Sequence, residues 1–170
     1  MNSLTRKTTV AGLLGAMTVV LAVSPIGRIP VPWTGLVATT MHLPAIIGGI
    51  LEGPAVGAGV GLIFGVYSWL VPSNPFFSNP LVSVLPRLLI GPLAYLAFRA
   101  TRRAEWAAVA GTVTNTAGVL GMIGLFGYLP WKAVLGVAAT NGLGEVVLAT
   151  VVVGLFYRKV SAFHGPGRAI

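Results

Sequence analysis

The sequence contains no cysteine, and charged residues make up only 8% of its 170 residues. The absence of cysteine excludes disulfides, thiol nucleophiles and thiolate metal sites. A soluble domain carries about a quarter charged residues, so this chain has too few to cover a water-facing surface. Hydrophobic residues reach 55%, and the mean hydropathy is +0.89. This composition predicts a polytopic membrane protein.

Catalytic motifs are missing as well. The chain has no G-x-x-x-x-G-K-[ST] phosphate loop and no H-E-x-x-H motif, and its two histidines are far apart in the sequence. We therefore expect no enzymatic activity, metal or cofactor, and if the protein is an active transporter, its energy comes from elsewhere. The net charge of +8 comes from basic residues that sit in pairs between apolar runs, which argues against a nucleic-acid surface.

Proline, glycine and polar clusters divide the chain into six apolar segments. The predicted helices are Thr8–Val23, Leu36–Leu51, Pro54–Val71, Leu81–Phe98, Ala104–Phe126 and Lys132–Tyr157. We interpret the first segment as a retained helix rather than a cleaved signal peptide. The second is short and carries Pro44, which predicts a kink or a partial crossing. The expected fold is a single all-α domain, 1–170, with six transmembrane helices.

Basic residues predict the orientation of these helices. With both termini in the cytoplasm, eight cations lie inside and only Arg28 and Lys132 lie outside, which agrees with the positive-inside rule. The eight are Arg6, Lys7, Arg99, Arg102, Arg103, Arg158, Lys159 and Arg168.

Polar residues within the predicted spans identify a candidate binding site. Arg87 is expected roughly 9 Å below the outer end of its helix, and Glu145 roughly 20 Å down the last helix. Asn141 lies one turn above Glu145 on the same face. Asn115, with Thr112 and Thr116 nearby, lies near the middle of the fifth helix. Such residues suit a cavity for a small polar ligand that enters from outside, and Arg87 suggests a ligand with a carboxylate.

Each of these residues also has a structural alternative. Glu145 and Arg87 could form an ion pair, and Asn115 could be an interhelical hydrogen-bonding residue. His42 is expected to line or support the pocket or to contact the ligand. Trp69 could belong to the interfacial aromatic belt, together with Trp33, Tyr128 and Trp131, or could cover a ligand. Asn79, in the polar loop before the fourth helix, is the remaining candidate contact.

Small residues at intervals of four allow close approach between membrane helices. The first helix carries two such pairs, Ala11 with Gly15 and Gly12 with Ala16, and the third carries Gly57, Gly61 and Gly65. They predict either internal packing or a surface for a partner membrane protein.

Two long segments resemble the substrate-binding S components of energy-coupling factor (ECF) vitamin transporters. They read MHLPAIIGGILEGPAVGAGVGLIFGVYSWL and NPLVSVLPRLLIGPLAYLAFR. Within the similar region, about residues 8 to 157, the stretches HLPAIIGGILEGP, GTVTNTAGVLGMIGLFG and NGLGEVV are most similar to pantothenate-type members.

The resemblance implies a six-helix subunit of the bacterial cell membrane that binds its vitamin at the outer face, with loop 1 (Ser24–Trp33) as a lid. It also implies docking of the small-residue motif of the first helix, Ala11, Gly12, Gly15 and Ala16, on a transmembrane coupling subunit. Two cytoplasmic ATPases then drive uptake. Pantothenate is the preferred ligand, with Arg87 for its carboxylate and Asn115, Asn141 and Glu145 for its hydroxyls and amide. Folate, pyridoxine and pyrimidine ligands of the thiamine type remain alternatives. A stand-alone secondary transporter and an integral membrane enzyme or assembly factor are the competing functions.

Overall fold

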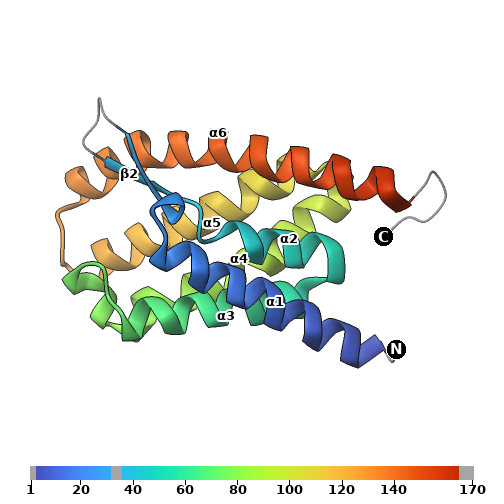
Figure 1. Cartoon of the computed structure of the whole chain (residues 1–170). Helices are drawn as coiled ribbons and strands as arrows, with labels where there is room; N and C mark the ends of the chain where they lie inside the picture. The colour runs from blue at the N-terminus through green and yellow to red at the C-terminus, as the bar shows by residue number, and fades with distance from the viewer. Residues whose placement is uncertain (1–2, 32–35, 165–170) are drawn as a thin grey trace.

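The computed structural model describes residues 3–31 and 36–164. Its elements, in chain order, are α1 (Ser3–Val23), η1 (Pro25–Gly27), β1 (Arg28–Val31), β2 (Leu36–Thr39), α2 (Leu43–Glu52), α3 (Pro54–Leu70), η2 (Pro75–Ser78), α4 (Pro80–Thr101), α5 (Ala104–Leu125) and α6 (Trp131–His164). Figure 1 shows the helices running along one common direction, with the β1–β2 hairpin lying across one side. Trp33 and Arg168, for which the sequence predicts an interfacial and a cytoplasmic place, lie outside the described residues.

The described chain is nearly all helical, as predicted. Four helices, α1, α4, α5 and α6, are long and apolar enough to cross a membrane. The α3 helix has 17 residues, near the lower limit for a span, and α2 has 10. A ten-residue helix rises only about 15 Å, so α2 by itself covers about half of a bilayer core.

The helix predicted over Leu36–Leu51 is wrong in its first part. Leu36–Thr39 forms β2, which pairs antiparallel with β1 from Arg28↔Thr39 to Val31↔Leu36. Pro44 explains where the helix begins, because proline has no N–H and clashes with the preceding turn inside a helix. The structure places Pro44 in the first turn of α2, where no donor is needed.

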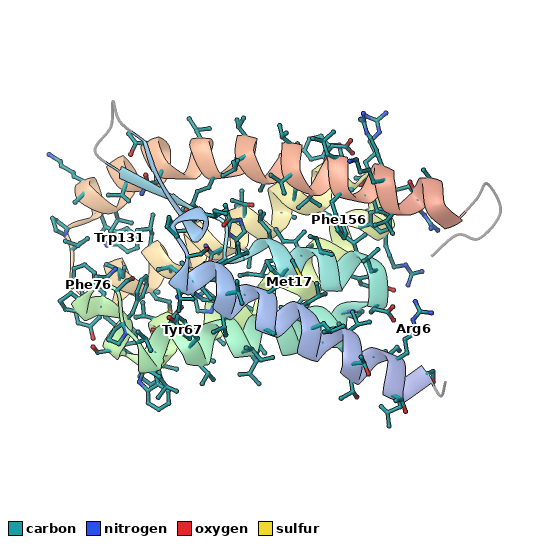
Figure 2. The ribbon with its side chains drawn as sticks, viewed as in Figure 1. Arg6, Met17, Tyr67, Phe76, Trp131 and Phe156 are labelled. Atoms are coloured by element: carbon teal, nitrogen blue, oxygen red, sulfur yellow. The ribbon has the colours of Figure 1, made fainter. Side chains whose placement is uncertain are left out.

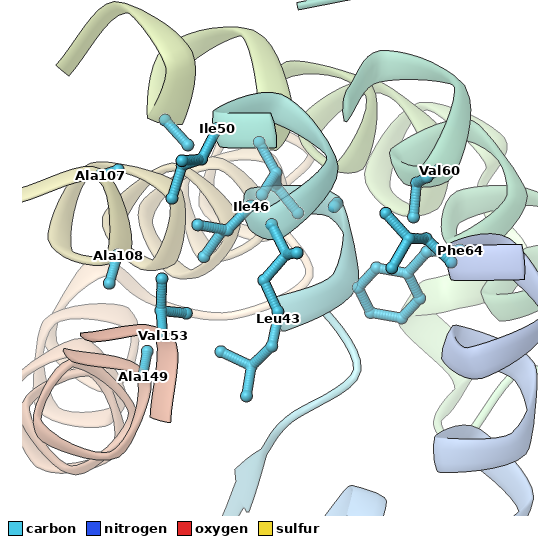
Figure 3. Packing of buried hydrophobic residues seen from close by; sticks show 14 of the residues in the cluster. Leu43, Ile46, Ile50, Val60, Phe64, Ala107, Ala108, Ala149 and Val153 are labelled. Carbon is cyan, nitrogen blue, oxygen red and sulfur yellow. The ribbon is translucent and has the colours of Figure 1, made fainter. Parts of the chain in front are cut away.

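The short α2 helix forms the centre of the bundle. Every residue from Leu43 to Ile50 is buried. Figure 3 shows Ile46 and Ile50 between α3 on one side and α5 and α6 on the other. The facing residues are Val60 and Phe64 of α3, Ala107 and Ala108 of α5, and Ala149 and Val153 of α6. A helix that is apolar on all sides is stable in such a position because every face packs.

Glycines bring α3 into direct contact with α4. A Cβ atom on Gly57 would lie 2.7 Å from the Cα of Gly91, and one on Gly61 would overlap the carbonyl oxygen of Arg87. A Cβ atom on Gly65 would likewise lie 2.8 Å from the Cα of Val84. The Gly57–Gly61–Gly65 stripe is therefore internal packing, one of its two predicted roles. This packing fixes the position of the Arg87 backbone along the axis of α3.

Ion pairs mark one end of the bundle. Arg6, near the start of α1, binds Glu52 at the end of α2 at 2.6 Å, and Arg158 on α6 binds Glu105 on α5 at 3.1 Å. In Figure 2, Arg6 lies at this end, while Phe76 and Trp131 lie at the opposite end. The start of α1 and the end of α6 are thus on the same side.

The glycine contact leads to a stability prediction. We expect Gly61→Ala to lower the free energy of unfolding by about 1–3 kcal/mol, because the new methyl group forces α3 away from the α4 backbone. Gly59→Ala is the matched control, since nothing lies within 4 Å of its Cβ position and alanine is the better helix former. Thermal unfolding of the purified protein in detergent measures both. Equal melting temperatures for the two variants would contradict the proposed packing.

Candidate functional site

A cavity of about 470 Å³ opens among β2, α3, η2, α4, α5 and α6. This volume falls within the range of about 300–1,000 Å³ that small-molecule sites occupy. Phe76 contributes to its lining, so the cavity lies toward the end of the bundle opposite the two ion pairs.

Four of the predicted polar residues meet in this cavity. Arg87 from α4, Asn115 from α5, and Asn141 and Glu145 from α6 all line it. Three separate helices therefore bring a cation, an anion and two amides to one space. Arg87 and Glu145 are only 3% and 5% exposed, so bulk water solvates neither charge well.

Arg87 is held by contacts with uncharged groups. Its Nη1 donates a hydrogen bond to the carbonyl oxygen of Val82 at 2.6 Å. Its Cζ lies 4.6 Å from the ring centroid of Phe77 and 5.4 Å from that of Phe64. These are cation–π distances, and they orient the guanidinium. In the part of the chain that the structure describes, no carboxylate lies within ion-pairing distance of Arg87.

Glu145 forms hydrogen bonds instead of pairing with Arg87. Its Oε1 accepts from the backbone N–H of Thr39 at 2.9 Å and from the Thr39 hydroxyl at 2.7 Å. Its Oε2 accepts from the Thr116 hydroxyl at 2.8 Å. The alternative of a direct Arg87–Glu145 ion pair is therefore wrong. Thr39 could not be identified from the sequence because its position depends on the pairing of β1 with β2.

Two buried polar atoms around the cavity have no hydrogen-bond partner among the described residues. They are Nε of Arg87, a donor, and Oδ1 of Asn115, an acceptor. Leaving such a group unsatisfied costs about 1–3 kcal/mol. Because both residues line the cavity, a polar ligand that offers an acceptor and a donor would satisfy them.

Three predicted contacts lie outside the cavity lining. His42 is fully buried at the start of α2, and its Nε2 lies 2.9 Å from the Thr112 hydroxyl. Trp69 is 41% exposed. The Oδ1 of Asn79 accepts from the N–H of Leu81 and caps α4, while its Nδ2 donates to the Tyr128 hydroxyl at 3.2 Å. His42 and Asn79 therefore bond to other parts of the fold around the cavity, while Trp69 lies at the surface.

Most of the remaining wall is apolar or aromatic, and Ser68, Ser73 and Asn74 add polar groups to it. Phe76 stacks on Tyr128 with ring centroids 5.7 Å apart, which joins η2 to the turn between α5 and α6. Sequence reasoning missed these lining residues, because their apolar side chains are indistinguishable from lipid-facing or core residues. They include Phe64, Tyr67, Phe76, Phe77, Val119, Leu120, Ile123, Leu129 and Val137.

The small residues of α1 divide between two faces. Gly15 is buried, and a Cβ there would overlap the side chain of Ile63 on α3. Gly12 and Ala16 are exposed, and nothing lies within 4 Å of the Cβ position of Gly12. Of the two overlapping pairs, Gly12 with Ala16 is the one on the outer surface.

Comparison with known proteins gives an independent result. Residues 6–157 match the family described as "ECF transporter, substrate-specific component". The Pantothenic acid transporter PanT of Lactococcus lactis subsp. cremoris (strain MG1363) is 36% identical over an alignment that covers 66% of this chain and 72% of that protein. The apolar helices and these matches agree with a multi-pass protein of the cell membrane. The chain belongs to the substrate-specific S components of ECF transporters, which are transport subunits and not enzymes.

Proposed function

We propose that the cavity captures pantothenate at the outer face of the cell membrane and that partner subunits then drive its ATP-dependent uptake. The observation that carries this proposal is a buried guanidinium, Arg87, that lines the cavity with no carboxylate within ion-pairing distance among the described residues. Burial of an unpaired charge is costly, and an anionic ligand that pairs with it offsets part of that cost. The similarity to a pantothenic acid transporter supports the same ligand.

The chemical groups of pantothenate match the cavity. Its carboxylate would accept hydrogen bonds from Arg87, including one from the unsatisfied Nε. Its hydroxyl and amide N–H groups would donate to Oδ1 of Asn115 and to Asn141. Its dimethyl segment would pack on the apolar wall beside Leu120 and Ile123. His42, Trp69 and Asn79 would support this arrangement from outside the cavity.

Other vitamins fit less well. Folate is a dianion, and Arg87 is the single cationic side chain among the described lining residues. A pyridoxine or pyrimidine ligand would need the carboxylate of Glu145, both oxygens of which already accept hydrogen bonds. Because Glu145 is already bonded to Thr39 and Thr116, the one cation in the described lining favours a ligand with a single negative charge.

The distribution of charge supports an orientation with both termini in the cytoplasm. Arg6, Lys7 and Arg158 lie at the end where α1 begins and α6 ends, whereas Lys132 lies near the start of α6, at the opposite end. Under the positive-inside rule the basic end is cytoplasmic and the cavity is near the outer face. The six helices would all belong to the membrane domain, with α2 crossing only in part.

A transmembrane coupling subunit and two cytoplasmic ATPases are the proposed partners. The exposed pair Gly12 and Ala16 on α1 gives a partner helix room for close backbone approach. Gly15 and Ala11 would contribute from the inner side of α1, and Gly15 would do so by keeping α1 close to α3.

The Arg87→Ala variant tests whether the guanidinium binds pantothenate. We expect Arg87→Ala to weaken pantothenate binding to the purified chain by roughly 30-fold or more, because a buried charge pair is worth about 2–5 kcal/mol when one partner is truncated. Isothermal titration calorimetry measures the affinity. Arg99→Ala is the control, since Arg99 is an exposed cation on the same helix. Unchanged affinity in Arg87→Ala would remove Arg87 from the site.

The second unsatisfied atom is Oδ1 of Asn115, and we expect its removal to lower the affinity less than the loss of Arg87 does. Asn115→Ala removes an acceptor, and we expect roughly tenfold weaker pantothenate binding for the loss of about one hydrogen bond. Thr114→Val serves as the comparison, because the Thr114 hydroxyl bonds to the Ala110 carbonyl oxygen of its own helix at 2.7 Å. If the two variants bind equally well, Asn115 does not contact the vitamin.

The partner surface is tested separately from binding. We expect Gly12→Leu to bind pantothenate normally but to lose most uptake in cells, because the larger side chain blocks the approach of a coupling subunit. Gly136→Leu on α6 is the control, since nothing lies within 4 Å of that position either. Uptake that persists in cells lacking the coupling ATPases would instead favour a stand-alone transporter.

A further inference from the structure

We infer that Glu145 is a positioning residue rather than a ligand contact, and that its carboxylate anchors the end of the β1–β2 hairpin to α5 and α6 beside the cavity. The inference rests on the proposed function of the cavity, because it assigns a role in retaining the bound vitamin. It differs from the role that the sequence predicts for Glu145, which is direct binding of the substrate.

Glu145 already accepts three hydrogen bonds from the protein itself. A carboxylate has about four acceptor positions, and three of them receive the N–H and hydroxyl of Thr39 and the hydroxyl of Thr116. All three distances fall between 2.7 and 2.9 Å. Hydrogen bonds to a charged group are about twice as strong as neutral ones. Glu145 is thus already satisfied by the protein before a ligand arrives, unlike Arg87 and Asn115.

The architecture explains why the hairpin needs such an anchor. The α2 helix is too short to run the length of the bundle. The hairpin lies across the bundle beside α6, in the space that a longer α2 would otherwise fill (Figure 1). Its strands have only four residues each, and an isolated two-stranded hairpin is at best marginally stable. At its base, Thr40 donates to the carbonyl oxygens of Gly27 and Ile26. These bonds stay within the segment that precedes α2 and do not reach α5 or α6.

Thr39 connects the anchor to the cavity. It is the last residue of β2, it lines the cavity, and its hydrogen bonds to Glu145 bridge 106 positions of sequence. Loss of these bonds would free the end of β2 and open the cavity wall beside Thr116. The expected consequence is faster escape of the ligand, with the contacts to Arg87 unchanged.

A double-mutant cycle on the full-length chain separates positioning from direct contact. The readout is the dissociation rate of radiolabelled pantothenate. We expect Glu145→Leu to raise that rate roughly 10- to 100-fold and Thr39→Val to raise it several-fold, as estimated from the strength of charge-assisted hydrogen bonds. The double variant should dissociate no faster than Glu145→Leu alone, because both act through one contact. Rates that multiply would show that Glu145 contacts the ligand independently and would overturn the inference.

Conservative variants keep the test informative if Glu145→Leu does not fold. Glu145→Gln retains an acceptor oxygen for Thr39, and we expect a dissociation rate within a few-fold of the unmodified chain. Thr140→Val is the matched control on α6, because the Thr140 hydroxyl bonds to the carbonyl oxygens of Gly136 and Val137 in its own helix. A Gln variant that dissociates as fast as the Leu variant, or as fast as Arg87→Ala, would contradict a positioning role.

A measurement without ligand distinguishes this inference from the proposed function. The chain has no cysteine, so nitroxide labels can be placed at Ile26→Cys and Leu143→Cys, which are 68% and 69% exposed. We expect Thr39→Val and Glu145→Gln to broaden the distance distribution between these labels modestly and Glu145→Leu to broaden it strongly. An unchanged distribution in Glu145→Leu would overturn the anchor even if pantothenate binds. Failure of pantothenate to bind the unmodified chain, with a broadened distribution, would reject the proposed ligand and leave the anchor standing.

Discussion

The structure depends on a guanidinium that lies inside a membrane protein with no carboxylate within ion-pairing distance among the described residues. Desolvation of such a charge costs several kcal/mol, and side chains of this kind are rare within spans. The fold holds Arg87 by the carbonyl oxygen of Val82 and by the rings of Phe64 and Phe77. The close approach of α3 at Gly61 fixes the backbone from which the side chain extends. These contacts orient the cation and leave its charge available to a ligand.

The two ends of the bundle use their glutamates differently. Glu52 and Glu105 pair with arginines at the basic end, where they join α1 to α2 and α5 to α6. Glu145, near the cavity, bonds to hydroxyl and amide donors and joins the hairpin to the helices. Small residues show a similar division. Gly57, Gly61 and Gly65 face α4, whereas Gly12 and Ala16 face outward. Small residues at intervals of four therefore pack α3 against α4, whereas on α1 they leave an open surface.

Much of this could be predicted from the sequence. Long apolar runs that end at proline, glycine or arginine located α3, α4 and α5 to within three residues, while α1 and α6 extend further than predicted, by about one and two turns. Polar residues within spans have few stable places, so Arg87, Asn115, Asn141 and Glu145 were expected together, and the structure does bring them together.

The errors have physical causes. The segment before Pro44 is apolar enough for a helix, and only its pairing with β1 makes it a strand. Thr39 reaches Glu145 through that pairing, which no local pattern in the sequence reveals. His42 and Asn79 bond to Thr112 and Tyr128 and do not line the cavity, and such partners depend on how the helices pack. The apolar wall was missed for the same reason, since leucine and phenylalanine look alike in a core and in a pocket.

Native mass spectrometry of the purified full-length chain tests the central claim most directly, because it weighs any small molecule that the cavity retains. We predict a bound species with the mass of pantothenate on the unmodified chain and its absence from Arg87→Ala. A bound vitamin that lacks a carboxylate, or pantothenate retained in full by Arg87→Ala, would contradict the claim that this buried cation recognises the ligand.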